Sequence, residues 1–334
     1  MPRTLLLFVA LLPACSPSNE DLPNVPATQR DAGALTPGDP MLSPDAAALP
    51  ATASLAPDGG AGTAPATPAC AEAYALRAHA PAEPSRPYDV PATASTYACF
   101  SFAVPWQGKR HGLRIESLID NARVLHHWQL YQVNTPNVED GKVEACFCAH
   151  PDAQLVSGWA PGREDLTMPQ GVGLKLPETS SGHFVLELHY NNAASSQGAV
   201  DQSGVRLCDT DKLRSEEAAT HWLGTENITI PAGERATAFG TCMPKGTAHI
   251  LNVWPHMHRL GRHLKTVIER ADGSVETLVD EAFAFDYQRS NPRDLTVSAG
   301  DRLRTTCTFD GDATGPVHYG TGSSDEMCYN FVLA

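Results

Sequence analysis

The sequence predicts an all-β protein built from β-sandwiches, and three features lead to this class. Short apolar runs of alternating character are bounded by Gly, Pro, Asn and Asp, which is typical of strands separated by turns. No sustained apolar period of about 3.6 residues competes with this pattern. With 334 residues, of which 42% are hydrophobic, the chain is long enough for two modest cores.

The expected strands follow one another from Cys70 onward. The clearest alternating runs are Ser95–Val104, Gly112–Ile119, Val124–Val133, Gly182–Tyr190, His249–Trp254, Thr266–Arg270 and Leu303–Phe309. The stretch Lys212–Thr220 is polar and charged, and the apolar pattern resumes at Trp222 and Leu223. We therefore place a domain boundary near residue 212 and expect two domains, over residues 70–212 and 213–334.

The first 15 residues have the organisation of an export signal. Arg3 supplies the positive charge, Leu5–Leu12 form the apolar stretch, and small residues follow. Residues Leu12–Cys15 resemble the lipobox of bacterial lipoproteins, which would make Cys15 the lipidated residue after cleavage. Because Pro13 is not typical of a lipobox, plain secretion is the alternative. In both cases we expect an exported protein.

Residues 16–69 are dominated by Ala, Pro, Asp, Ser, Thr and Gly and contain no aromatic residue. Such a segment cannot bury enough apolar surface to offset its chain entropy, so we expect a disordered tether. No run of about 18 or more apolar residues follows the signal, which leaves a lipid anchor as the expected membrane contact. The net charge of −14 argues against nucleic acid as a partner, because phosphate backbones are bound through basic patches.

The nine cysteines bear on the compartment. If Cys15 carries a lipid, an even number remains, which in an exported chain allows up to four disulfides. The remaining cysteines are Cys70, Cys99, Cys146, Cys148, Cys208, Cys242, Cys307 and Cys328. Zinc binding is the alternative, and only Cys146 and Cys148 are close enough in sequence to suggest it.

Two pairs of histidines are the first candidates for metal ligands. His126 and His127 are adjacent in an apolar run, and neighbours on a regular strand point to opposite faces. They can hold one ion together only at a strand end or a local distortion, and such pairs are more often one core and one surface residue. His256 and His258 are two residues apart, which places both imidazoles on one face of a strand.

Two further side chains complete the candidate set. His189 lies at the end of the apolar run Phe184–Tyr190 and, taken alone, is a half-buried strand histidine. Met327 precedes Cys328 in a polar segment. A methionine normally fills a core, but its thioether is also a ligand that favours Cu(I) over Zn, Mg or Ca.

Six elements stand in a fixed order along the chain. They are His126-His127, Gly158–Gly162, Pro169–Gly173, His189-Tyr190, His256–Gly261 and Ser323–Cys328. This order resembles the copper type II, ascorbate-dependent monooxygenases, the family of the peptidylglycine α-hydroxylating and dopamine β-hydroxylating enzymes. The resemblance covers residues 97–330, and the ordered set is specific where any single element would not be.

The resemblance implies a fold and a metal site for each half of the chain. Family members fold as two tandem antiparallel β-sandwich domains, jelly-roll-like, that face one another across a solvent-filled cleft with one copper each. The ligands of the first site, an electron-transfer centre, match His126, His127 and His189. The ligands of the second, the catalytic site where O2 binds, match His256, His258 and Met327.

The implied reaction is hydroxylation of a C–H bond by O2, with two electrons from a one-electron reductant such as ascorbate. One oxygen atom enters the substrate and the other leaves as water. Imidazoles tolerate both Cu(I) and Cu(II), whereas the weak Met327 sulfur favours the reduced ion that meets O2. The expected cofactors are therefore two copper ions, with O2 and ascorbate or a similar reductant as co-substrates.

The resemblance also bears on the cysteines. It matches Cys307 and Cys328 to a family disulfide, which would stabilise the fold by about 3 kcal/mol in the chain-entropy model and would fix Met327 beside it. Cys99 matches a family half-cystine. The other pairings that we favour are Cys99 with Cys146, with Cys148 as the alternative partner, Cys208 with Cys242, and Cys70 with Cys148.

The substrate end departs from the peptide-amidating member of the family. That enzyme holds its substrate's carboxylate with an Arg two residues before the His-x-His pair, and with Asn and Tyr after the Met-Cys element. Here these positions are Trp254, Tyr329 and Phe331, so peptide amidation is not expected. The aromatic side chains favour an apolar or aromatic small-molecule substrate, although Trp254 and Phe331 equally fit a core role.

We therefore expect a monomeric, exported copper monooxygenase. One alternative is a copper-binding surface lipoprotein that stores copper or carries electrons without turnover. The six-ligand set argues against it, because a store gains nothing from one thioether site facing a separate imidazole site. The other alternative is a plain β-sandwich adhesion module whose histidines are incidental, and binding of copper would separate it from the first two.

Overall fold

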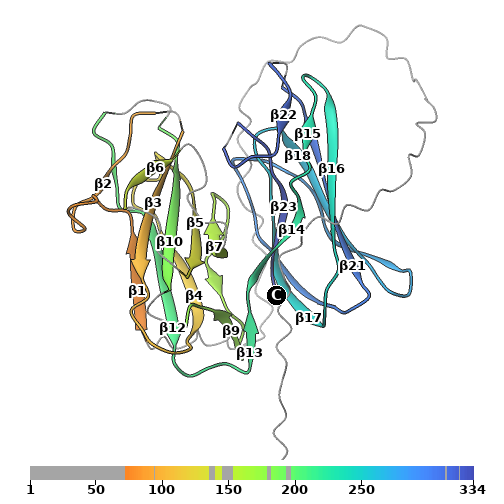
Figure 1. Cartoon of the computed structure of the whole chain (residues 1–334), viewed down its shortest axis with the longest axis horizontal. Helices are drawn as coiled ribbons and strands as arrows, with labels where there is room; N and C mark the ends of the chain where they lie inside the picture. The colour runs from red at the N-terminus through yellow and green to blue at the C-terminus, as the bar shows by residue number, and fades with distance from the viewer. Residues whose placement is uncertain are drawn as a thin grey trace, which may run out of the picture. The chain divides into compact units, whose positions relative to one another are not determined.

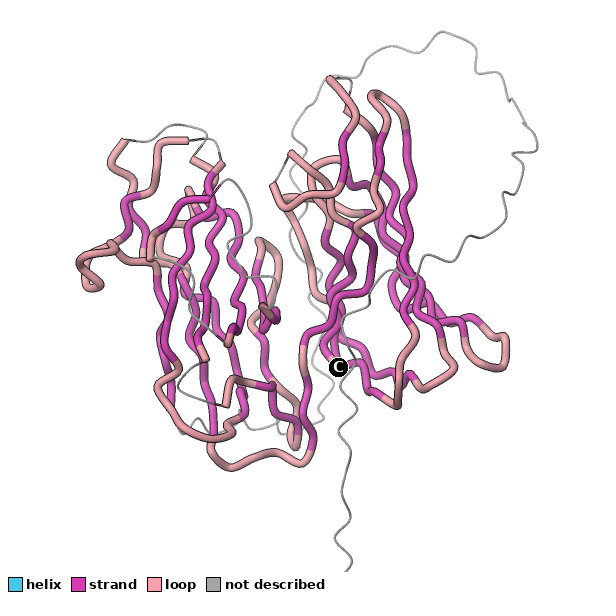
Figure 2. The backbone as a smooth tube through the Cα atoms, in the orientation of Figure 1, coloured by secondary structure: helices cyan, strands magenta, loops and turns pink. Residues whose placement is uncertain are grey.

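The structure, a computed structural model, describes residues 72–93, 95–134, 140–144, 153–178, 182–192, 197–312, 314–322 and 324–334. Within these residues the chain forms strands joined by loops (Figure 1) and no α-helix (Figure 2). The predicted all-β class is confirmed. None of the described residues belongs to a helix that is long and apolar enough to cross a membrane. The expected signal and tether lie outside the described residues.

The first sandwich consists of two sheets that enclose one core (Figure 1). One sheet has the strand order β1-β12-β4-β9-β13, with β8 paired to β4, and contains β1 (Glu72–Arg77), β12 (Gly204–Thr210), β4 (His111–Leu118), β9 (Val172–Lys175), β13 (Glu216–Ala218) and β8 (Leu166–Thr167). The other has the order β6-β3-β10-β5-β7 and contains β6 (Lys142–Glu144), β3 (Thr96–Ala103), β10 (His183–Tyr190), β5 (Leu125–Val133) and β7 (Gln154–Trp159). A separate pair is formed by β2 (Tyr88–Asp89) and β11 (Val200–Asp201). Ile115 and Leu207 of one sheet share the core with Leu130 and Leu186 of the other.

The second sandwich also has two main sheets. One has the order β14-β23-β17-β20 and contains β14 (Thr220–Thr225), β23 (Cys328–Leu333), β17 (Ala248–His256) and β20 (Asn291–Val297). The other has the order β16-β21-β18-β19 and contains β16 (Arg235–Cys242), β21 (Arg302–Asp310), β18 (Gly261–Glu269) and β19 (Val275–Ala282). A short pair is formed by β15 (Thr229–Ile230) and β22 (Val317–His318). Val253 and Val332 share its core with Leu264 and Phe309.

Most of the predicted strand runs agree closely with the observed strands, but β18 begins earlier than its predicted run, Thr266–Arg270. Near its start Gly261 and Leu264 are buried, whereas Arg262 and Lys265 are exposed, because the register with β21 shifts between Gly261 and His263. The polar side chains interrupt the apolar run in the sequence, although the backbone continues the ladder with β21. Backbone pairing with β21 therefore extends the strand beyond the apolar stretch that predicted it, across a β-bulge that breaks the period of two.

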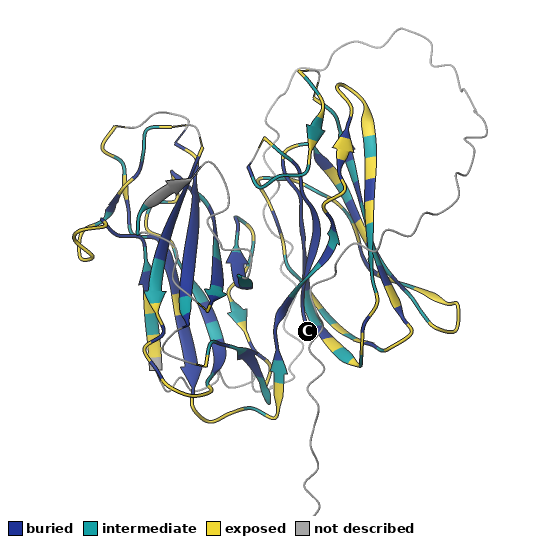
Figure 3. Ribbon diagram, viewed as in Figure 1, coloured by how far each residue is buried: buried dark blue, intermediate teal, exposed yellow. Residues whose placement is uncertain are grey.

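Strand β23 is buried along its whole length (Figure 3) because its two faces contribute to different cores. Cys328 and Val332 pack into the core of the second sandwich. Phe331 and Leu333 belong to the cluster that contains the core of the first sandwich. The same alternation on β17 places Trp254 in that first cluster.

The chain passes from one sandwich to the other shortly after the boundary placed near residue 212. β13 pairs in parallel with β9 of the first sandwich, and β14 then pairs with β23 of the second. The change of sandwich therefore falls between Ala218 and Thr220.

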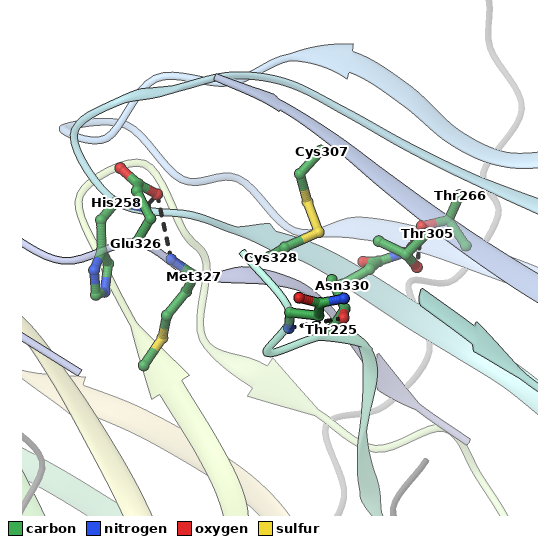
Figure 4. The surroundings of a disulfide bond; sticks show 10 residues. Thr225, His258, Thr266, Thr305, Cys307, Glu326, Met327, Cys328 and Asn330 are labelled. Carbon is green, nitrogen blue, oxygen red and sulfur yellow. Dashed lines mark hydrogen bonds between the residues drawn. A yellow bond between two sulfur atoms is a disulfide. The ribbon is translucent and has the colours of Figure 1, made fainter. Parts of the chain in front are cut away.

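A disulfide between Cys307 on β21 and Cys328 on β23 links the two main sheets of the second sandwich (Figure 4). It is the bridge that the family resemblance implies. Cys99, Cys208 and Cys242 are disulfide-bonded as well. Outside the described residues lie Cys15, Cys70, Cys146 and Cys148. The lipidation of Cys15 and the other pairings therefore stay predictions.

Candidate metal centres

His126 and His127 lie on β5, beside His189 on the neighbouring strand β10. In the ladder between these strands His189 pairs with His127, but the next residue, Tyr190, pairs with Leu125. His126 is therefore the extra residue of a β-bulge. The bulge interrupts the alternation that sends neighbouring side chains to opposite faces. It is the local distortion that adjacent histidines require to approach one ion.

The three imidazoles form a compact triad. The Nδ1 atoms of His126 and His127 are 3.0 Å apart, and one ligand nitrogen from each of the three rings lies within 4.8 Å of the others. Nδ1 of His189 is buried and has no hydrogen-bond partner among the described residues. A buried nitrogen without a partner is costly, and a bound ion would satisfy it. The donor set fits an ion that accepts imidazole ligands, copper among them.

Neighbouring side chains orient the triad from outside. Ser95 Oγ lies 2.8 Å from Nε2 of His189, and Tyr97 stacks on the same ring with 4.3 Å between centroids. Asp286, from the loop between β19 and β20, places its Oδ1 3.4 Å from Nε2 of His126. Partners on the outer nitrogen of a metal-binding imidazole fix its tautomer and orientation. In the first set, the rings of His126 and His189 therefore each have a supporting partner on the outer nitrogen.

The second candidate set combines the end of β17 with the start of β23. His256 is the last residue of β17, His258 follows in the turn, and Met327 directly precedes β23. All three side chains line one pocket. Nδ1 of His256 donates to Oε1 of Gln288 at 2.9 Å, and Nδ1 of His258 donates to the carbonyl oxygen of Asp325 at 3.0 Å. Each ring therefore keeps an unprotonated Nε2, the form that binds a metal.

Glu326 ties the two parts of the second set together. Its buried carboxylate accepts the backbone N–H groups of His258 at 2.9 Å and of Leu260 at 2.6 Å. It also accepts the N–H of Met327 at 3.3 Å (Figure 4). Burial raises the pKa of Glu326 to about 7, against the opposing effect of these hydrogen bonds. One side chain thus fixes both the turn after β17 and the backbone at Met327.

Burial lowers the pKa of every histidine in the two sets. The pKa falls to about 3 for His189 and His256 and to about 4 for His258. Burial also lowers the pKa of His126, and that of His127 well below its ordinary value. Positive charge on the second-set histidines would further disfavour protonation of His127, so the two sets are close enough to affect one another. At neutral pH all these imidazoles are neutral and able to bind metal.

The loop between β19 and β20 supports both sets. Phe285 stacks on His126 with 4.8 Å between ring centroids, and its ring lies edge-on to His258 at 6.2 Å. Together with Asp286 and Gln288 it contacts ligands of both sets. Ser95, Tyr97 and these three loop residues are not among the predicted site residues. They stand outside the six sequence elements, and no spacing relates them to the ligands.

The structure thus brings His126, His127 and His189 together, and separately His256, His258 and Met327. Their identity as copper ligands stays a prediction. Glu326 is also not among the predicted site residues, although it lies inside the element Ser323–Cys328. Its position beside Met327 was the one available signal.

Comparison with known proteins matches two family models to successive segments of the chain. The family model for the copper type II ascorbate-dependent monooxygenase N-terminal domain matches residues 85–197, and the C-terminal domain of that family matches residues 216–333. DBH-like monooxygenase protein 1 of Gallus gallus is 30% identical over 278 residues, and dopamine beta-hydroxylase of Rattus norvegicus is 30% identical over 275 residues. Each alignment covers 73% of this chain but only 45% and 44% of the respective relative. The chain therefore spans less than half the length of these relatives.

Proposed function

Because this chain belongs to the copper type II ascorbate-dependent monooxygenase family, we propose that it is an exported enzyme that hydroxylates a C–H bond of an organic substrate with O2. A one-electron reductant such as ascorbate is the second co-substrate, and two copper ions are the cofactors. Two electrons and two protons enter with O2. One oxygen atom is inserted into the C–H bond and the other leaves as water.

One observation supports the proposal: two sets of uncharged metal-binding side chains lie close together. Contacts with neighbouring residues hold four of the imidazole rings, those of His126, His189, His256 and His258. Copper, when bound, supplies one-electron redox chemistry and a place for O2. The three imidazoles of the first set suit an ion that accepts and passes on electrons. The thioether of Met327 suits the reduced ion, so the second set is the proposed oxygen site.

The chain's own residues have three tasks in this proposal. Gln288 and the carbonyl of Asp325 keep the protons of His256 and His258 on Nδ1. Glu326 holds the turn and Met327 in register. The aromatic walls of the pockets beside the second set would contact an apolar or aromatic part of the substrate and exclude water. These walls are formed by Trp128, Trp159, Trp222, Trp254 and Phe331.

We also propose where the enzyme acts. The disulfide between Cys307 and Cys328 supports an oxidising compartment outside the cytoplasm. A lipid on Cys15 would hold the protein at a membrane surface, and secretion is the alternative. The functional unit is proposed to be a monomer, with a small organic molecule and not nucleic acid as its partner.

Copper loading followed by turnover tests the proposal. We expect up to two copper ions per folded chain. After anaerobic reduction, O2 and ascorbate should give hydroxylated product from a panel of aromatic and aliphatic C–H compounds, with oxygen consumption coupled to product. A folded preparation that binds no copper would overturn the proposal. Bound copper with no substrate-dependent oxygen consumption would replace it with a non-catalytic copper carrier.

Met327→Ile tests the assignment of the oxygen site. The variant should keep the first copper and lose turnover, because isoleucine fills the space but offers no sulfur. Met168→Ile is the matched control, since Met168 is also buried but packs in the core of the first sandwich. Wild-type turnover by Met327→Ile would show that the second set is not the oxygen site.

A further inference from the structure

A tight turn after β7 carries Arg163 toward the second set. The N–H of Arg163 donates to the carbonyl oxygen of Ala160 at 3.0 Å. Pro161 and Gly162 occupy the central positions, and Gly162 has a φ of 91°. This fits a type II turn, which favours proline second and needs a positive φ third. The N–H of Gln288 also donates to the carbonyl oxygen of Pro161, so the turn is fixed against the loop that supports both sets.

The guanidinium group of Arg163 lies over the indole ring of Trp254. Its Cζ is 4.0 Å from the ring centroid, within the range of a cation–π contact. Trp254 precedes His256 by two residues on β17, so their side chains emerge on the same face of the strand. Arg163, Trp254 and His256 line one pocket, together with Trp159 and Phe331. A guanidinium group therefore reaches the pocket that adjoins the proposed oxygen site.

No acidic side chain among the described residues pairs with the charge of Arg163. Within the described part of the chain its guanidinium group has no hydrogen bond or ion pair, and burial lowers its pKa to about 9. It is still charged at neutral pH. Arg270, in contrast, pairs with both Glu276 and Asp301. A partly buried cation without an anion is unfavourable, so this site would gain from an anionic ligand.

The size of the pocket limits what the anion can be. Its open volume is about 30 Å³, which is room for roughly two water molecules. The two oxygens of a carboxylate fit this space. Arginine matches a carboxylate well, because its N–H donors form a fixed fork that can bind both oxygens.

We propose that Arg163 binds the carboxylate of the substrate, so that the enzyme acts on an organic acid with an apolar or aromatic body. The inference rests on the proposed function, because it assumes that a substrate reaches the second set. The guanidinium comes from the turn after β7 and not from the strand position that Trp254 occupies. Arg163 is then a specificity-determining residue, and Trp254 positions it.

Binding of matched acids and amides tests the proposal without turnover. The probes are phenylacetate, 3-phenylpropionate and 4-phenylbutyrate with their primary amides, titrated calorimetrically into the oxidised, copper-loaded protein. For at least one pair the wild type should bind the acid about 10- to 100-fold more tightly than the amide, as a charge-assisted hydrogen-bond pair contributes. Absence of any acid preference in the wild type would overturn the proposal.

Two variants and one control locate the preference. Arg163→Gln should remove it while amide binding changes by less than about threefold. Arg163→Lys keeps the charge but not the fork, and should retain only part of it. Arg302→Gln is the control, because Arg302 is an exposed arginine on β21 outside the pocket. An unchanged acid preference in Arg163→Gln, or in Arg163→Lys if the first variant does not fold, would overturn the assignment.

Turnover separates the failure of this inference from failure of the proposed function. If binding shows an acid preference that depends on Arg163, but no probe is hydroxylated with coupled oxygen consumption, the anion site is supported and the proposed enzymatic activity is contradicted. If acids and amides are hydroxylated and the acid-to-amide ratio of kcat/KM is the same in wild type and Arg163→Gln, the enzymatic activity is supported and the anion site at Arg163 is contradicted.

Discussion

Replacement of Glu326 by glutamine probes how the second set is built. The carboxylate of Glu326 is fully buried; its Oε2 accepts the N–H groups of His258 and Met327, and its Oε1 accepts that of Leu260. Glutamine has nearly the same size, but only its oxygen accepts hydrogen bonds, and its amide nitrogen donates. Whichever way the amide is turned, an NH2 group faces at least one backbone N–H.

The magnitude follows from these contacts. A hydrogen bond to a charged group contributes about 1.5–3 kcal/mol, and a buried donor without a partner costs about 1–3 kcal/mol. If the amide replaces Oε1, Leu260 loses its acceptor; if it replaces Oε2, His258 and Met327 lose theirs. We expect the free energy of unfolding to fall by about 3 kcal/mol. The backbone that carries Met327 should also lose its register with His258.

Urea unfolding and copper analysis measure the two effects. The experiment is run at pH 8, where Glu326 is mostly ionised given its pKa of about 7. Asp301→Asn is the matched control, because the nearly buried Asp301 also accepts two backbone N–H groups, from Ser298 and Ala271. Glu326→Gln should bind one copper fewer, whereas Asp301→Asn should lose stability and keep its copper. Wild-type stability in Glu326→Gln, or equal copper loss in both variants, would refute the reasoning.

Two further predictions concern the supports of the site. Gln288→Leu removes the acceptor of the His256 Nδ1–H and should weaken Cu(I) binding at the second set about 10- to 100-fold; competition with a Cu(I) chelator measures this, and unchanged affinity would contradict it. Gly162→Ala places a Cβ at a φ of 91° and should lower the free energy of unfolding by about 1–3 kcal/mol. Urea unfolding checks it, and an alanine variant as stable as wild type would mean that the turn does not adopt this conformation.

Strand positions could be predicted because period-two burial leaves a visible pattern wherever the buried residues are apolar. The pattern fails at the start of β18, where buried Gly261 contributes no apolar side chain and exposed Arg262 and Lys265 dilute the signal. It also cannot show that β23 faces two cores. A strand that is apolar on both faces indicates burial, but not what each face contacts.

The ligands of the two sets could be proposed from residue type, spacing and order, but the geometry that unites them could not. Adjacent His126 and His127 converge because the ladder with β10 contains a bulge. The register between two strands cannot be derived from the sequence of either strand alone. The outer hydrogen bonds are equally non-local. Gln288 reaches His256 from a loop 32 residues away along the chain, and a loop polar residue has no periodicity that would identify it.

The same limit explains why the sequence alone favoured an apolar or aromatic substrate without an arginine to bind it. At the strand position where the amidating enzyme has its arginine, this chain has Trp254. What a pocket binds, however, depends on the groups that reach it from any element. The ring of Trp254 offers a favourable face for a cation, and the turn fixed by Gly162 delivers Arg163 to that face. The aromatic residue therefore does not replace a charge in this pocket. It provides the surface on which a charge from the other sandwich is held.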